Sequence, residues 1–228
     1  MSIAELIREG KLTRLLKVTV LGTSGSGKTS FLASLFGNQF ILGDVKRQDY
    51  LEDKANLTYT PIDVEESTTT VSLNQLGAMM IFTKSNQCEI VELQKGVSSI
   101  LERDDIDYFM TFSIFDTAGQ ERFDFMSDIT IKGSDAIIIV CDGTNVSSIE
   151  YLNYYIEKIK HEEMRTGKTI PVIVFMNKVD LAERGLYLGA DFARIAISNE
   201  YDVFETTIKN SESFHTPLRI LVDKINNL

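Results

Sequence analysis

The sequence has few of the residues that would place it among disulfide-bonded, zinc-binding or membrane-spanning proteins. Its 228 residues include two cysteines, Cys88 and Cys141, and two histidines, His161 and His215. Two cysteines, of which Cys141 lies in an apolar run, supply neither a disulfide scaffold nor a zinc ribbon, and the histidines add no ligand pair. No apolar run approaches the roughly 20 residues needed to span a bilayer. We therefore expect a reduced, cytoplasmic protein.

The chain also lacks an excess of positive charge. Its 23 basic residues face 33 acidic ones, a net charge of -10, which repels nucleic-acid phosphates and anionic lipid heads. The chain ends without a cysteine for prenylation, and Met1-Ser2 lacks the glycine for myristoylation, so no lipid anchor is expected. Ile3, Leu6 and Ile7 could form only a short amphipathic helix, so we expect membrane contact to be weak or indirect.

Short apolar runs alternate with segments of helical character. Residues 15–21 form an apolar, β-branched run before a glycine-rich turn, and residues 29–36 suit a helix. The same alternation continues, with expected strands at 108–115, 136–141 and 171–176 and expected helices at 146–161 and 213–227. Near-continuous apolar strands indicate a sheet buried on both faces. We predict a doubly wound α/β fold with a mostly parallel sheet, as one domain over residues 1–228.

Two segments fit this alternation poorly. Residues 43–67 are rich in charged and turn-forming residues. In residues 83–106, the apolar side chains from Ile90 to Leu101 permit an amphipathic helix interrupted by Gly96.

A glycine-rich segment follows the first expected strand directly. Residues 22–29 match G-x-x-x-x-G-K-[ST] between a strand and a helix, the context that gives the pattern meaning. The glycines let backbone N–H groups converge at a helix N-terminus, which binds phosphate. Lys28 can reach the β and γ phosphates, and the Thr29 hydroxyl can ligate magnesium. A chance glycine-rich turn is the alternative. The nucleotide contacts expected here are Gly22, Ser24, Gly25, Ser26, Gly27, Lys28, Thr29 and Ser30.

A second motif, residues 177–180, bears on which base is bound. Asn177, Lys178 and Asp180 follow an apolar strand, at the sheet edge where open α/β folds bind ligands. The Asp180 carboxylate only accepts hydrogen bonds, which complements the N1–H and exocyclic amine of guanine, whereas adenine has no such donor pair. A solvated turn is the alternative, and the phosphate loop favours guanine recognition.

A third motif, residues 116–120, follows the expected strand at 108–115. Asp116 can hold magnesium through water, and Gly119 allows its N–H to approach a γ-phosphate. Gln120 can donate and accept at once, which suits orienting a water for in-line attack. The alternative is an aspartate that ends a strand before a glycine turn.

Four segments, in order, resemble motifs of the Ras-like small GTPases, and most of all of the Rab branch. They are GTSGSGKT (22–29), DTAGQERF (116–123), CDGTNVSSI (141–149) and NKVD (177–180). The resemblance implies the three-layer P-loop NTPase fold, with GTP or GDP and Mg²⁺ as ligands.

The resemblance implies two further base contacts. Residues 205–209, ETTIK, resemble the E-T-S-A-K loop whose backbone contacts guanine O6, with Thr207 and Ile208 in place of Ser and Ala, followed by Lys209. Phe40 resembles the aromatic residue that stacks edge-on against the base. The alternative for Phe40 is a residue that fastens the end of the first helix to the core.

The family also requires a threonine that senses the γ-phosphate and completes the magnesium shell. Aligning T-V-S-L-N with the family's T-I-G-V-D favours Thr70, and Thr69 is the runner-up. The alternative is a β-favouring residue that leads into a strand. From Phe40 to Thr70 the chain has 29 intervening residues, and from Thr70 to Asp116 it has 45. Both gaps exceed those of typical Ras or Rab proteins, so we interpret residues 43–67 and 84–106 as insertions.

The resemblance implies a GTP/GDP molecular switch that hydrolyses GTP slowly, with Lys28, Thr70 and Gln120 as catalytic residues and Thr29, Thr70 and Asp116 as metal ligands. It further implies effector proteins, with activating and exchange proteins as regulators. The alternative is a GTP-binding scaffold or assembly module with little hydrolysis, against which Gln120 argues. An ATP-using enzyme is disfavoured by the NKVD motif.

Overall fold

The structure is a computed structural model that describes residues 15–36, 41–42, 45–46, 73–75, 78–84, 88–92, 103–115 and 124–228. Several predicted site residues lie outside these ranges, namely Phe40, Thr69, Thr70, Asp116, Gly119 and Gln120.

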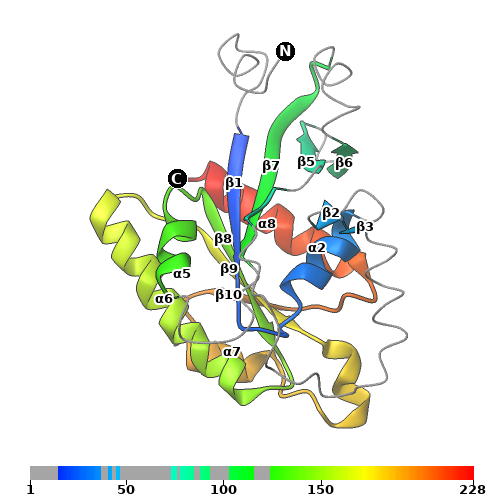
Figure 1. The fold of residues 1–228 in the computed structure, drawn as a ribbon, viewed down its shortest axis with the longest axis vertical. Coiled ribbons are helices and arrows are strands. Elements are labelled where there is room, and N and C mark those ends of the chain that lie inside the picture. Colours follow the sequence, from blue (N-terminus) through cyan, green and yellow to red (C-terminus); the bar gives the residue numbers. More distant parts are fainter. Residues whose placement is uncertain are drawn as a thin grey trace.

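A mixed sheet forms the centre of the molecule, in the order β10-β9-β8-β1-β7-β5-β6 (Figure 1). The five strands from β10 to β7 are parallel to one another. Their bounds are β1 Leu15–Leu21, β7 Ile106–Phe115, β8 Ala136–Asp142, β9 Val172–Asn177 and β10 Asp202–Glu205. The predicted mostly parallel α/β sheet is confirmed. Because these strands are parallel, their carboxyl ends meet at one edge, where ligands bind in such folds.

Antiparallel strands extend the sheet beyond β7. They are β4 Leu73–Gln75 and β5 Ala78–Thr83, which both pair with β7, and β6 Cys88–Glu92, which pairs with β5. The amphipathic helix considered for residues 83–106 is therefore wrong for Cys88–Glu92, because these residues form a hairpin with β5. A separate two-stranded hairpin joins β2 (Ile41–Leu42) to β3 (Val45–Lys46).

Helices cover both faces of the sheet (Figure 1). On one face lie α2 and α8, and on the other lie α5, α6 and α7. Their bounds are α2 Lys28–Phe36, α5 Asp124–Ile131, α6 Val146–Thr166, α7 Ala190–Ala196 and α8 His215–Asn226, with short 3-10 helices η3 Val179–Arg184 and η4 Ser211–Phe214. This is the predicted doubly wound arrangement. Among the residues described, no helix combines the length and apolar character needed to cross a bilayer.

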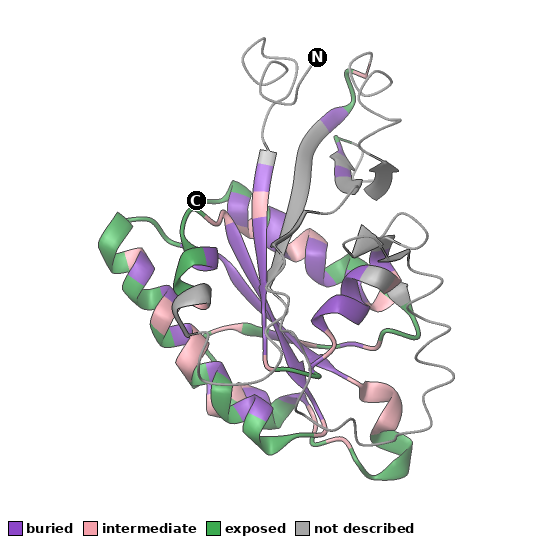
Figure 2. Ribbon diagram, viewed as in Figure 1, coloured by how far each residue is buried: buried purple, intermediate pink, exposed green. Residues whose placement is uncertain are grey.

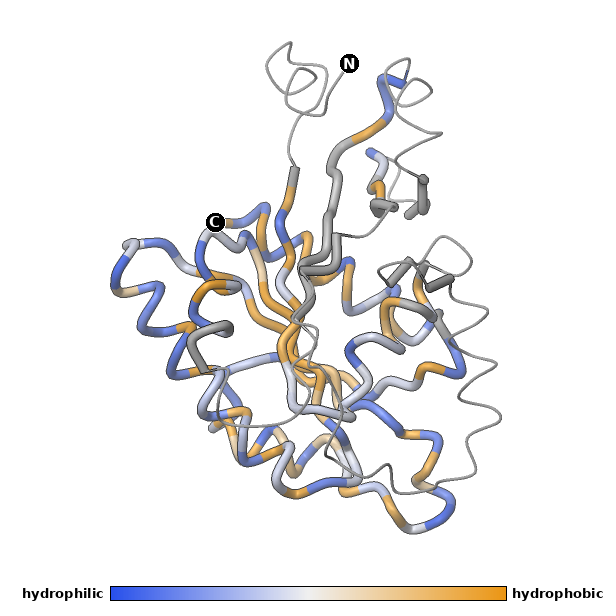
Figure 3. The backbone as a smooth tube through the Cα atoms, in the orientation of Figure 1, coloured by the Kyte–Doolittle hydropathy of each residue, from blue (hydrophilic) through white to orange (hydrophobic). Residues whose placement is uncertain are grey.

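Successive side chains of β8 point to opposite faces of the sheet, so this strand contributes to the core on both faces. Ile138 and Val140 pack toward α2 and α8, whereas Ile137 and Ile139 pack toward α5, α6 and α7. Figures 2 and 3 show the consequence, a buried and apolar set of central strands between helices whose outer surfaces are exposed. Strands buried on both faces explain why these runs are apolar without alternation.

Three aromatic rings connect the phosphate-loop helix to the rest of the domain. Phe31 of α2 lies with its ring centroid 5.2 Å from that of Phe175 in β9 and 4.7 Å from that of Phe214 in η4. Each such pair contributes about 0.5–1.5 kcal/mol beyond area burial. The helix that follows the phosphate loop is thus fixed against the strand that leads to the NKVD motif.

The buried thiol of Cys141 in β8 yields a test of the packing. Only 1% of the residue is exposed, and burial raises its pKa to about 11. Because the thiolate is the reactive form, native Cys88→Ser protein should resist a thiol-directed reagent at pH 8 and react once urea unfolds it. Counting labelled thiols by mass spectrometry with and without urea checks this, and stoichiometric labelling of the native protein would contradict the packing.

Candidate functional site

The phosphate loop connects the carboxyl end of β1 to α2. Gly22, Gly25 and Gly27 have positive φ angles of 146°, 72° and 100°, which residues with a side chain rarely adopt. At Gly27 an added Cβ would lie 2.3 Å from Nδ2 of Asn177. The glycine spacing in the sequence therefore reflects a tight loop that is pressed against the NKVD motif.

Lys28 extends back along this loop. Its Nζ donates to the carbonyl oxygens of Gly22 and Thr23, both at 2.8 Å. Lys28, Thr29 and Ser30 are all buried at the start of α2, as is Ser26 in the loop. The Ser26 hydroxyl has no hydrogen-bond partner within the described part of the chain. A buried ammonium beside a glycine-rich loop is a positive charge placed where the sequence predicts phosphates.

One hydrogen bond joins the phosphate loop to the base motif. The Asn177 Nδ2 donates to the carbonyl oxygen of Ser26 at 3.0 Å, across 151 positions of the sequence. Both residues are buried. The two motifs therefore meet at the carboxyl edge of the parallel strands, close enough for one ligand to reach both.

Asp180 lies in η3, directly after β9, with its carboxylate partly exposed. Thr207 Oγ1 donates to its Oδ1 at 2.8 Å, and Lys209 Nζ pairs with its Oδ2 at 2.6 Å. Burial alone would raise the pKa of Asp180, but the hydrogen bonds from Lys209 and Thr207 outweigh burial and hold the pKa below its usual value. The carboxylate therefore stays ionised and accepts hydrogen bonds throughout the physiological pH range.

The ETTIK segment is bonded to the NKVD motif by its backbone as well. Thr206 N–H donates to the Met176 carbonyl at 3.0 Å, and Val179 N–H donates to the Thr206 carbonyl at 3.2 Å. Ile208 is connected to α2, since Ser34 Oγ donates to its carbonyl oxygen at 2.9 Å. Thr207 thus retains the hydroxyl of the serine it replaces, and the loop is held at the site although it differs from the family pattern at two positions.

Lys178 has a left-handed backbone, with φ of 72°. Its Nζ pairs with Oδ2 of Asp142 at 2.6 Å, and Thr144 donates to the other carboxylate oxygen from its N–H and its hydroxyl. Burial raises the pKa of Asp142, but the bonds from Lys178 and Thr144 bring it below its ordinary value. An ionised carboxylate therefore orients Lys178.

Sequence reasoning did not single out Asp142 or Ser34 as site residues. Asp142 could have been found from the sequence, because it ends an apolar strand within the CDGTNVSSI segment. Ser34 could not, since its contact is with Ile208, 174 positions away.

Two described strands, β4 and β7, begin or end within a few sequence positions of the residues predicted to hold the metal. Leu73 at the start of β4 pairs with Phe115 at the end of β7. The roles predicted for Thr70 or Thr69, Asp116, Gly119, Gln120 and Phe40 remain predictions, because these residues lie outside the described ranges.

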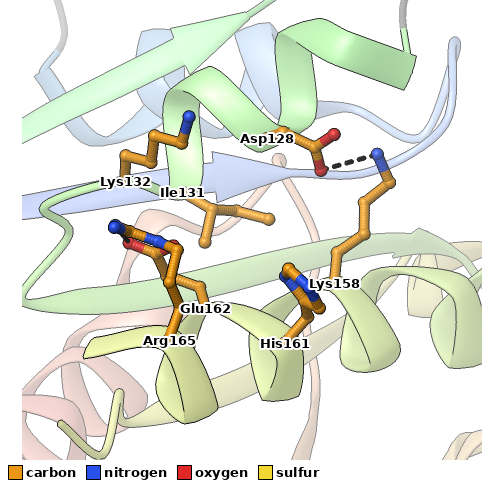
Figure 4. Close-up of a pocket in the computed structure, with 7 residues that line it drawn as sticks. All are labelled: Asp128, Ile131, Lys132, Lys158, His161, Glu162 and Arg165. Atoms are coloured by element: carbon orange, nitrogen blue, oxygen red, sulfur yellow. Dashed lines mark hydrogen bonds and ion pairs between the residues drawn. The ribbon is translucent and has the colours of Figure 1, made fainter. Parts of the chain in front are cut away.

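A separate cavity of about 390 Å³ lies between α5 and α6 (Figure 4). None of the predicted nucleotide contacts lines it. Lys158 pairs with Asp128 across it at 2.8 Å, and the buried Glu162 pairs with Arg165 at 2.7 Å. The four charges are thus neutralised in pairs, and the cavity is lined by Asp128, Ile131, Lys132, Lys158, His161, Glu162 and Arg165.

The sequence matches the Ras family over residues 80–227, more than half of the chain but without the phosphate loop. Intraflagellar transport protein 27 homolog of Homo sapiens is 30% identical over 115 residues, covering 50% of this chain and 61% of that protein. Ypt/Rab-type GTPase YPT7 of Saccharomyces cerevisiae is 26% identical over 205 residues, covering 89% and 77%. Ras-related protein Rab-9A of Homo sapiens is 30% identical over 105 residues, covering 46% and 52%. The match thus spans about three-fifths of the first relative's length.

Proposed function

Because the chain belongs to the Ras family and is related to its Rab members, we propose that it binds GTP and GDP and acts as a molecular switch with slow, magnesium-dependent hydrolysis. The observation that carries the proposal is the Asn177–Ser26 hydrogen bond, because it places the base motif against the phosphate loop. A single nucleotide then has its base at Asp180 and its phosphates at Lys28.

The residues present suit such a nucleotide. Each Asp180 oxygen already accepts one bond and retains a further lone pair for guanine. Lys209 is 67% exposed in its side chain, so its ammonium can leave Oδ2 at little cost when a base arrives. The positive-φ glycines of the loop allow its N–H groups to face the phosphates.

Hydrolysis would depend on residues that follow β1 and β7 in the sequence and on Thr70, which precedes β4. Thr29, Thr70 and Asp116 would hold magnesium, which when bound neutralises negative charge on the phosphoryl oxygens. Lys28 would offset charge on the β and γ phosphates, and Gln120 would orient the attacking water. No arginine in the sequence is clearly placed as a catalytic finger, so we propose that an activating protein supplies one.

The whole chain would serve as one GTP-binding domain with insertions at 43–67 and 84–106. Within the second proposed insertion, residues 88–92 form β6, which lengthens the sheet at the edge of β5. Both insertions flank the proposed first switch, and we propose them as surfaces for effector or exchange proteins in the cytoplasm.

Identifying the nucleotide that remains bound through purification tests base choice. We expect mass spectrometry of the denatured protein to find GDP or GTP, since Asp180 pairs with a donor pair that adenine lacks. Recovery of adenine nucleotides would contradict the role of Asp180.

Single-turnover phosphate release tests hydrolysis. We expect a rate on the order of 10⁻⁴ per second, as for unaided Ras, and a lower rate for Gln120→Leu. If the unchanged protein releases no more phosphate than Gln120→Leu, the chain is a GTP-binding module without hydrolysis.

A further inference from the structure

A loop outside the four motifs lies beside the base-recognition site. Residues 185–189 connect η3 to α7, and at their centre Tyr187 is half-buried against the core on the α6 face. Its ring abuts Gly143, where an added Cβ would lie 2.2 Å from Cε2 of Tyr187 and 2.7 Å from the Asn177 carbonyl oxygen. Only glycine at 143 allows the ring to approach this closely.

The backbone of the loop continues this connection. Leu188 N–H donates to the Gly143 carbonyl at 2.8 Å, and Gly143 N–H donates to the Asn177 carbonyl at 3.0 Å. The loop, the end of β8 and the first residue of the NKVD motif therefore form one bonded series.

The Tyr187 hydroxyl connects the loop to the end of β9 and, through the same carbonyl oxygen, to the ETTIK segment. It donates to the Met176 carbonyl at 3.2 Å, the same oxygen that accepts the Thr206 N–H at 3.0 Å. The Glu205 carboxylate binds the other end of the loop, accepting the Ala190 N–H at 3.2 Å. Burial, and then the neighbouring Glu205, raise the pKa of Tyr187 above its ordinary value, so the hydroxyl keeps its proton and remains a donor.

We propose that Tyr187 is a positioning residue for guanine recognition, which holds the end of β8, the NKVD motif and the ETTIK loop at a fixed spacing. This inference rests on the proposed function, in which Asp180 binds the base. Asp180 must meet the N1–H and the exocyclic amine together, and hydrogen bonds weaken steeply when donor and acceptor are misaligned. Because Thr207 orients the Asp180 carboxylate from the ETTIK loop, a change in loop spacing changes the direction of that carboxylate.

The test compares Tyr187→Phe with Tyr201→Phe. Phenylalanine keeps the ring against Gly143 and removes only the hydroxyl. Tyr201 is a half-buried tyrosine on the same core cluster and precedes the amino end of β10, whereas the ETTIK loop follows its carboxyl end. The quantity measured is the ratio of the dissociation constants of inosine diphosphate and GDP. Inosine lacks the exocyclic amine, so this ratio reports one of the two bonds to Asp180.

We expect Tyr187→Phe to lower this ratio by about fivefold, the scale of one net hydrogen bond, and Tyr201→Phe to leave it unchanged. A purely structural role would weaken both nucleotides equally, so an unchanged ratio for Tyr187→Phe would overturn the inference. If that variant cannot be purified, Glu205→Ala, which releases the loop at Ala190 from an exposed position, must lower the ratio instead. If the unchanged protein does not prefer GDP at all, the proposed function fails rather than this inference.

Discussion

Replacing Asp180 by asparagine is expected to lower the affinity for GDP by about a thousandfold and to create a preference for xanthosine diphosphate. Asparagine has one acceptor oxygen where aspartate has two, so the variant loses one charge-assisted hydrogen bond, worth roughly 1.5–3 kcal/mol, and the other becomes a weaker neutral bond. The asparagine side chain also presents an N–H group to the N–H groups of guanine, and two facing donors cannot form a hydrogen bond. Xanthine has oxygen in place of the amine at C2, so it accepts the bond that asparagine now offers. Competition binding with a fluorescent guanine nucleotide measures both changes.

The matched control for this substitution is Asp191→Asn. Asp191 is also an aspartate near the start of a helix, but its side chain is 87% exposed and pairs with Arg194, so nucleotide preference should stay unchanged. Asp180→Asn should itself remain folded, because the Thr207 hydroxyl can still donate to the amide oxygen and the lost Lys209 pair is largely solvated. A variant that is folded and still prefers GDP would remove Asp180 from the base site.

The parts of the site that could be predicted are those encoded locally. The phosphate loop is a contiguous pattern with a strand before it and a helix after it, and its positive-φ glycines are where the pattern places them. The position of Asp180 just after β9 could be predicted in the same way, because the apolar run of this strand ends where the NKVD motif begins. Parallel strands then bring both motifs to one edge, which the Asn177–Ser26 bond confirms.

The parts that could not be predicted depend on distant pairing. Ile90 and the apolar residues after it have helical spacing, yet residues 88–92 form β6 because β5 offers an unpaired edge. β10 was not anticipated, since of its four residues Asp202–Glu205 only Val203 is buried. Ser34 and Tyr187 make their contacts with residues of other elements, and no local pattern in the sequence predicts such contacts.

Replacing Gly22 by alanine is expected to destabilise the protein by about 3–5 kcal/mol, the largest stability effect we predict. Gly22 leaves β1 with φ of 146°, and a Cβ there would lie 2.2 Å from the carbonyl oxygen of Val140. That oxygen belongs to the backbone of a fully buried central strand, so it cannot move aside as a side chain would. Backbone strain and overpacking each cost roughly 1–3 kcal/mol, and here both apply.

Gly133→Ala separates the two causes, because Gly133 has a φ of 69° but nothing within 4 Å of an added Cβ. It should cost only the left-handed strain of about 1 kcal/mol. Urea unfolding followed by circular dichroism, with and without excess GDP and magnesium, measures both variants. A loss that is equally large without nucleotide comes from the fold itself, whereas a loss seen only with GDP reflects weaker binding. If Gly22→Ala is no less stable than Gly133→Ala in nucleotide-free buffer, the close approach of the phosphate loop to β8 is wrong.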